Sequence, residues 1–133
     1  MNWTCEFPVR YDDLDAQGHV GSARWLTVLE RARVDMLEQI AVPFHELQRR
    51  GVGAVVAEAH LQFLRPARFG DRIVVRITPT DPSESGLKLR YSVLNQESKA
   101  LLRAWTTMVF VDLDGRRSAM PDDVRDRLFD DGN

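Results

Sequence analysis

The feature that most constrains the fold is a change of hydrophobic period along the chain. From Trp25 to Ile40, apolar residues recur at the spacing of an amphipathic helix, and Pro43 ends or bends that element. Apolar and polar residues then alternate with period two in segments separated by turn-rich stretches, namely 55–64, 73–77, 87–93 and 100–111. Because strands joined by short turns pair antiparallel, this pattern predicts a sheet with one buried face.

Two further segments complete the α+β architecture. Residues 3–11 predict a first strand, and Pro8 places it near a sheet edge. Residues 120–129 predict a short helix with Pro121 near its first turn, followed by a polar tail at 130–133. In the strand at 55–64, one face is expected to carry Ala57, Ala59, Leu61 and Phe63. The order of strand, long helix and four strands predicts a single domain, residues 1–133.

Composition excludes several classes of protein. The formal net charge of −2 provides no general attraction to nucleic acid or to an anionic membrane. Cys5 is the single cysteine, so neither an internal disulfide nor a metal site built on cysteine pairs is expected. The start of the chain does not resemble a signal peptide, and no stretch is apolar enough for a membrane span. We therefore expect a soluble cytoplasmic protein.

Charge gathers in "YDDLDAQGHV", residues 11–20, just before the predicted helix. A calcium loop starting at Asp13 needs a glutamate at its twelfth position, where this chain has Arg24. That loop also needs a preceding helix, whereas "FPVRY" looks extended, so no metal site is expected. A solvated loop remains open, because carboxylates are stabilised near a helix N-terminus.

The same stretch also suits a catalytic site. The first N–H groups of a helix have no partner within it, so they can bind a developing oxyanion. A carboxylate a few residues earlier can face the same carbonyl carbon, with Gly18 allowing the tight turn between them. A carboxylate is a weak nucleophile and needs an activated substrate, and a thioester suits it better than an amide.

The residues of this region resemble a known family. "VRYDDLDAQGHVGSARWLTVLERAR" is similar to the hotdog-fold acyl-CoA thioesterases of the 4-hydroxybenzoyl-CoA thioesterase class. "AHLQFLRPARFGDRIVV" and "TMVFVDLDGR" resemble later strands of that family, so the resemblance runs from about Val9 to Pro121. The positions that carry the first motif are Tyr11, Asp13, Asp15, Gly18, Val20, Trp25, Glu30 and Arg33.

The resemblance implies a fold, an activity and a site. The fold is a hotdog, with about five antiparallel strands around a helix from Ser22 to Ile40. The activity is hydrolysis of an acyl-CoA or acyl carrier protein thioester, without a cofactor. Asp15 acts as nucleophile or base, while the N–H of Ser22 binds the thioester carbonyl. The homodimer or homotetramer has its sites at subunit boundaries. The remaining implied site residues are His19, which polarises the substrate or orients water, and Gly18, Val20, Gly21 and Trp25, which bind substrate.

Alternatives stay open at several positions. Two alternatives to a thioesterase are a non-catalytic acyl-thioester-binding protein and a hotdog dehydratase that uses His19 with Asp15. Asp13 either orients the site residues or forms a turn, of which the turn is favoured, and Glu30 is a weaker alternative base. The turn "TDPSESG" is acidic and does not suit the CoA phosphates. The candidate groups that bind these phosphates are Arg65, Arg68, Lys88 and Arg90. His45 is expected in a turn and His60 in a structural role, and Arg31 is expected to pair with Asp35 along the helix.

Overall fold

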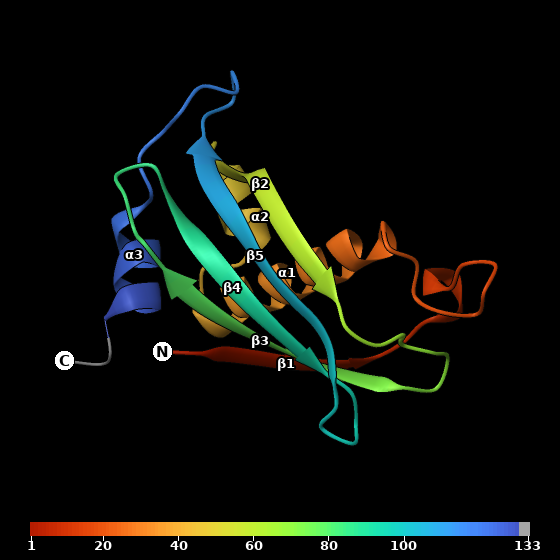
Figure 1. Ribbon diagram of the computed structural model, residues 1–133. Coiled ribbons are helices and arrows are strands. Elements are labelled where there is room, and N and C mark those ends of the chain that lie inside the picture. Colours follow the sequence, from red (N-terminus) through yellow and green to blue (C-terminus); the bar gives the residue numbers. More distant parts are fainter. Residues whose placement is uncertain (131–133) are drawn as a thin grey trace.

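The computed structural model describes residues 1–130, so the last part of the predicted polar tail lies outside it. Five antiparallel strands form one sheet in the order β1-β3-β4-β5-β2 (Figure 1). This matches the expected number and pairing of strands, and it places β1, which contains Pro8, at an edge as predicted. The strands are β1 (Trp3–Pro8), β2 (Gly53–Phe63), β3 (Arg72–Thr80), β4 (Gly86–Leu94) and β5 (Ala100–Val111).

One long helix packs on one face of this sheet. In Figure 1, α1 and α2 lie behind the sheet, and α3 lies at the end away from the loop that precedes α1. Among residues 1–130, no helix is both long and apolar enough to cross a membrane. The helices are a short 3-10 turn η1 (Tyr11–Asp13), α1 (Arg24–Gln39), α2 (Phe44–Arg49) and α3 (Asp122–Phe129).

The core forms between α1 and the inner face of the sheet. The alternation predicted for the middle strands is confirmed, because their inward residues are at most 7% exposed. Fully burying each large aliphatic side chain contributes about 1.5–3 kcal/mol, so this layer is the main source of stability. The buried residues of α1 are Trp25, Val28, Leu29, Ala32 and Met36; opposite them lie Ile73, Val75, Ile77, Leu87, Leu89, Tyr91, Val93, Leu102 and Ala104.

Strand β2 departs from the expected pattern. It forms the other edge of the sheet, and its register with β5 shifts between Val56 and Glu58. Most of the predicted apolar face is exposed instead, because Ala57 and Ala59 are open to solvent and Phe63 is 54% accessible, while Leu61 is partly buried against the core. The prediction of a buried face on this strand is therefore wrong for the chain described. An edge strand of this length and exposure is a surface on which another chain can pair.

The bounds of several elements differ from the prediction; the strand predicted at 3–11, for example, ends at Pro8. Helix α1 begins at Arg24 rather than Ser22, and residues 22 and 23 form a turn in front of it. A short helix, α2, was missed, so His45 lies in a helix rather than in a turn. Pro43 is the N-cap of α2, where its fixed φ suits the start of a helix.

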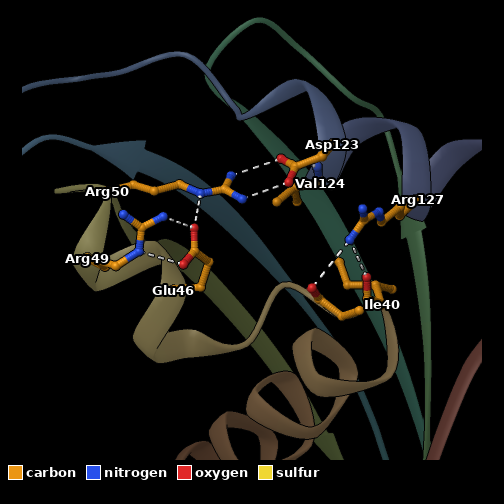
Figure 2. Close-up of polar contacts among 8 residues, drawn as sticks. Ile40, Glu46, Arg49, Arg50, Asp123, Val124 and Arg127 are labelled. Atoms are coloured by element: carbon orange, nitrogen blue, oxygen red, sulfur yellow. Dashed lines mark hydrogen bonds and ion pairs between the residues drawn. The ribbon is translucent and has the colours of Figure 1, made fainter.

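An ion-pair network joins α2 to α3 (Figure 2). Arg50 donates from Nε to Glu46 on its own helix and, through Nη1 and Nη2, to both carboxylate oxygens of Asp123 on α3. Arg127 on α3 donates to the carbonyl of Ile40 just after α1. Hydrogen bonds from Arg49 and Arg50 lower the pKa of Glu46 to about 2. The hydrogen bonds from Arg50 also lower the pKa of Asp123.

We expect Arg50→Gln to lower the free energy of unfolding at neutral pH, and to lower it by a smaller amount at acid pH. Carboxylates with lowered pKa stabilise the folded state above their unfolded pKa, and that contribution disappears as pH falls through the folded pKa. For Glu46 this window runs from its ordinary 4.5 down to about 2. Urea unfolding of both proteins at neutral pH and near the lower limit measures the effect. Arg49→Gln is the control, since Arg49 contacts Glu46 but not α3. An Arg50 effect that stays constant with pH would contradict this prediction.

The close approach of β4 to β5 at Gly86 leads to a second prediction. A Cβ at Gly86 would lie 2.3 Å from the carbonyl oxygen of Met108, which belongs to the backbone of the neighbouring strand. Gly86→Ala should therefore cost about 2 kcal/mol of unfolding free energy, measured by urea denaturation. Gly53→Ala is the matched control, because its Cβ would meet Val111 at an ordinary 3.6 Å. Equal stability of the two variants would contradict the argument.

Candidate active site

The acidic stretch folds back on itself in front of α1. Leu14 and Val20 form an antiparallel bridge, and the N–H of Asp15 donates to the carbonyl of His19 at 2.7 Å. The N–H of Gly18 closes the turn on the carbonyl of Asp15 at 3.0 Å. Gly18 has φ +79°, a left-handed conformation that glycine adopts without a steric cost. The tight turn predicted at Gly18 is therefore confirmed.

This turn fixes one oxygen of the Asp15 carboxylate. Oδ1 accepts hydrogen bonds from the N–H groups of Gln17 at 2.8 Å and His19 at 3.3 Å. The Asp15 side chain lies against Gly21, where an added Cβ would come within 3.5 Å of the Asp15 Cβ and 4.0 Å of Oδ2. Asp15 is exposed. Hydrogen bonds orient Oδ1, which leaves Oδ2 directed toward the segment that begins α1.

Backbone donors lie next to this carboxylate. The first turn of α1 closes when the N–H of Trp25 donates to the carbonyl of Gly21 at 3.2 Å. Within residues 1–130, no hydrogen bond uses the N–H groups of Ser22 or Ala23. Asp15, Gly21, Ala23, Arg24 and Thr27 contribute to the lining of one surface depression of about 380 Å³. Asp15 and Ala23, one of the two residues with a free N–H group, thus line the same depression, and an acyl-transfer site combines such a carboxylate with such donors.

The structure separates the other expected site residues. The side chains of Val20 and Trp25 are 6% and 3% exposed and belong to the hydrophobic core beneath the loop. His19 is half-buried, its ring makes no hydrogen bond within the described residues, and its backbone forms a bridge with Arg68. Of the expected residues, Asp15 and Gly21 line the depression, Ser22 directly follows Gly21 in the chain, and Gly18 shapes the turn behind them.

Asp13 anchors this loop to α1. Its carboxylate is 2% exposed and accepts the Arg31 guanidinium at 2.7 Å and 3.0 Å, together with the N–H of Arg10 at 3.0 Å. Its carbonyl accepts the N–H of Gly21 at 3.2 Å. The predicted turn-forming role is confirmed by the Arg10 bond. The predicted pairing of Arg31 with Asp35 is wrong, because Arg31 turns toward the loop instead.

Charge strongly affects the ionisation of Asp13. Burial alone would raise the pKa of this carboxyl group. Hydrogen bonds from Arg31 and from the N–H of Arg10, with the positive charges of Arg31 and Arg24, outweigh burial and hold the pKa below its ordinary value. Asp13 is therefore an ionised, buried group that ties the acidic loop to α1.

Sequence reasoning missed Arg24 and Thr27 as site residues. Both lie on the first turn of α1 and line the depression beside Asp15. Arg24 also donates to the carbonyl of Asp12 at 2.8 Å. Their position in the sequence could have identified them, because residues in the first turn of a helix lie close to any group that the helix N-terminus binds. Glu30, the weaker alternative base, lines a different cavity farther along α1.

The basic residues considered for CoA phosphates lie in different places. Arg68 bridges to His19 beside the loop, and Arg65 donates to the carbonyl of Ala100. Lys88 lies over the ring of Trp105, with Nζ 4.3 Å from the ring centroid. His60 stacks on the same ring, at 5.8 Å between centroids, which agrees with a structural role. Arg68 is thus the basic residue of that group whose backbone directly contacts the loop.

The acidic loop gathers no metal-binding group. Within residues 1–130, no three His, Cys, Asp or Glu side chains come together in a way that could hold a metal ion. The carboxylates of Asp13 and Asp15 are instead committed to Arg31 and to backbone N–H groups.

Comparisons with known proteins point to one family. The profile of the thioesterase-like superfamily matches residues 9–128. The chain is 31% identical over 115 residues to the acyl-CoA thioester hydrolase YbgC of Escherichia coli, covering 84% of this chain and 86% of that protein. Hypothetical protein TT1821 from Thermus thermophilus superposes with a TM-score of 0.86 at 34% identity, over 94% of this chain and 95% of that one.

A second solved structure establishes the fold. Slr0204, a 1,4-dihydroxy-2-naphthoyl-CoA thioesterase from Synechocystis, superposes with a TM-score of 0.90 at 24% identity, over 100% of this chain and 99% of that one. The sheet order and the long helix are those of the expected hotdog fold. With this fold and a superfamily profile that spans most of its length, the chain is a member of the thioesterase-like superfamily.

Proposed function

We propose that the chain, a single domain over residues 1–133, is an acyl-CoA thioesterase that releases a free acid and a thiol. Within the superfamily, the motif at residues 9–33 supports placing it in the 4-hydroxybenzoyl-CoA thioesterase class. The observation that carries the proposal is that the Asp15 side chain lies against Gly21, directly before the two residues, Ser22 and Ala23, whose N–H groups are free. Thioester hydrolases among the relatives support the same activity.

The proposed reaction uses these groups in turn. Oδ2 of Asp15 attacks the thioester carbon, or accepts a proton from a water molecule that attacks it. The carbonyl oxygen takes up the negative charge and accepts hydrogen bonds from the N–H of Ser22, with that of Ala23 beside it. The C–S bond then breaks and the thiolate leaves. In the covalent route, water hydrolyses the resulting anhydride and regenerates the Asp15 carboxylate.

The remaining site residues have supporting roles in this proposal. His19 polarises the substrate or orients the water molecule. Gly18 shapes the turn, and Gly21 lies against the side chain of Asp15. The side chains of Val20 and Trp25 pack in the core under the loop. They contribute to substrate binding by holding the backbone of the loop in place.

We place the enzyme in the cytoplasm, acting on acyl-CoA or on an acyl carrier protein thioester without a cofactor, nucleic acid or membrane partner. Either donor presents the same pantetheine arm. Arg24 lines the depression and Arg68 forms the bridge with His19 beside it, so both arginines are placed to bind the phosphates of the donor. Arg24 is 39% exposed, so its guanidinium remains accessible.

A panel of acyl-CoA substrates tests the activity. Short, long, branched and aryl acyl-CoAs are incubated with the protein, thiol release is recorded, and the product mass is determined. Free acid together with free CoA supports hydrolysis. With a 3-hydroxyacyl-CoA as an additional substrate, loss of one water with the thioester intact indicates a dehydratase that uses His19 and Asp15. Binding of all substrates without turnover indicates a non-catalytic acyl-thioester-binding protein.

We also propose that the active form is a homodimer or homotetramer. Strand β2 is an exposed sheet edge of 11 residues that carries Val55, Val56 and Phe63, each more than 40% exposed. Such an edge exposes unpaired backbone groups and apolar side chains, which pairing with a second copy would cover. Asp15 is likewise open to solvent, as expected for a site that a second subunit completes.

Light scattering at micromolar concentration should therefore give at least twice the chain mass. Val56→Lys places a charge on the exposed edge, and it should shift the protein toward monomer and lower turnover together. Ser98→Lys, in the turn between β4 and β5, is the control that should leave both unchanged. A wild-type monomer with full activity would contradict the proposed assembly.

A further inference from the structure

A second, apolar cavity lies at the other half of α1. Its volume is about 210 Å³, and α1, α2, α3 and the sheet enclose it. An apolar cavity of ~150 Å³ accommodates a benzene molecule, so by proportion this one accommodates roughly eight carbon atoms. Its buried wall consists of aliphatic, methionine and phenylalanine side chains, among them Leu47, Leu89, Met108, Phe110, Val124 and Leu128.

One face of α1 connects this cavity with the Asp15 depression. Ala23, Thr27, Glu30 and Val34 follow one another at spacings of four, three and four residues, which places them on the same side of a helix. Ala23 and Thr27 line the depression, whereas Glu30 and Val34 line the cavity. Seven residues separate Ala23 from Glu30, which corresponds to ~10 Å along the helix axis.

The open side of the cavity faces this stripe. Of its lining residues, Val34 is 38% and Phe44 46% exposed, and Glu30 and Ala54 are exposed as well. The carboxylate of Glu30 can stay in water at this opening, while the interior beyond it is apolar. A chain that arrives along α1 from Asp15 therefore meets the opening before the enclosed wall.

The wall is held in place without a ligand. Helices α2 and α3 supply part of it, and Arg50 binds them together through Glu46 and Asp123 (Figure 2). On the sheet side, Arg33 donates to the hydroxyl of Tyr91 at 3.1 Å, and that hydroxyl lies 2.7 Å from the Thr106 hydroxyl. The cavity is thus part of a tied framework, as preformed ligand pockets are.

We propose that this cavity binds the distal end of the acyl chain, which makes long-chain aliphatic thioesters the preferred substrates. Along a zigzag chain with C–C bonds of about 1.5 Å, roughly eight carbons cover the distance from the depression to the opening. Carbons beyond these enter the cavity, whereas a butyryl chain or a benzoyl ring stays near Asp15. This inference rests on the proposed thioesterase activity and specifies its substrate class.

A chain-length series tests the inference on the wild-type protein. Values of kcat/KM are measured for butyryl-, octanoyl-, lauroyl-, palmitoyl- and benzoyl-CoA. Beyond octanoyl, each methylene that enters the cavity should raise kcat/KM by roughly fourfold until the cavity is filled. A flat profile, or a preference for benzoyl-CoA, would overturn the inference and leave the thioesterase activity intact.

Two variants that fill the cavity from opposite walls test whether the preference for long chains arises in this cavity. Leu89→Phe from the sheet and Val124→Phe from α3 should each lower kcat/KM for palmitoyl-CoA by roughly tenfold or more, the cost of excluding two methylenes. Butyryl-CoA hydrolysis should stay within about twofold in both. Leu113→Phe, at a residue 87% exposed, makes the same exchange outside the cavity and should change nothing. Folding of each variant is checked by circular dichroism.

Calorimetric binding of free palmitate separates the two proposals. Palmitate should bind the wild type and the Leu113→Phe variant, and at least about tenfold more weakly to the filled variants. If no acyl-CoA is hydrolysed but palmitate binds in this pattern, the cavity assignment holds and the proposed enzymatic function fails. If palmitate binding is absent, or is equal in all variants, the cavity assignment fails.

Discussion

Asp15→Asn should lower the rate of thioester hydrolysis at least ~10²-fold, the lower end of the loss expected when a base is removed. The substitution keeps the shape of the side chain, and the amide oxygen can still accept the N–H groups of Gln17 and His19. Only the negative charge near Gly21 disappears, and with it the ability to attack a carbonyl or to accept a proton. Fold, oligomeric state and substrate affinity should therefore survive.

The measurement uses the best acyl-CoA of the panel, with kcat and KM determined separately and substrate affinity measured by calorimetry. Asp12→Asn is the matched control, because Asp12 lines the same depression but its side chain makes no hydrogen bond within residues 1–130. We expect that variant to keep most of the wild-type rate. Turnover close to wild type in a folded Asp15→Asn would remove Asp15 from the mechanism and direct attention to His19 and Glu30.

Arg31→Met should cost about 3 kcal/mol of unfolding free energy, because it leaves the buried carboxylate of Asp13 without its main partner. Arg31 supplies both of the side-chain hydrogen bonds to that carboxylate, whereas Arg24 approaches no closer than 3.7 Å. Since Asp13 also holds the backbone of Gly21, the loop that carries Asp15 should loosen, and kcat should fall more than KM changes. Urea denaturation and steady-state kinetics measure the two effects.

A double-mutant cycle separates the ion pair from simple loss of packing. Asp13→Asn removes the buried charge, so adding Arg31→Met to it should cost less than Arg31→Met alone. Arg31→Lys keeps the charge but loses the bidentate geometry, and it should lie between the wild type and Arg31→Met. Additive losses across the cycle would show that Asp13 and Arg31 are not energetically coupled.

The same pair predicts the direction of the acid response. The lowered pKa of Asp13 means that its contribution is present above the unfolded carboxyl pKa, and that it disappears as pH falls through the folded value. Wild type should therefore lose more stability than Asp13→Asn when the pH is lowered below the ordinary value of 3.8. The charge of Asp13 is thus expected to act on stability, which separates its role from the catalytic role proposed for Asp15.

The local pattern of residues was sufficient for most of the architecture. Period-two alternation predicted β3, β4 and β5, helical spacing predicted α1, and turn residues placed the connections between them. The tight turn at Gly18 was also predictable, because the chemistry of the turn depends on neighbouring residues. These features follow from interactions within a few residues, and one sequence contains all the information they need.

Features that depend on distant partners required the folded chain. Arg31 binds Asp13 rather than Asp35 because the loop returns to α1 at that point, and spacing along the helix cannot show this. Strand β2 has an apolar pattern but lies at an edge, because β5 is its single neighbour in the sheet described. The apolar cavity is formed by α1, α2, α3, β2, β4 and β5 together. From the sequence, a hydrophobic residue can be predicted only to be buried. Tertiary packing decides whether it fills the core, covers a sheet edge or lines a cavity for a ligand.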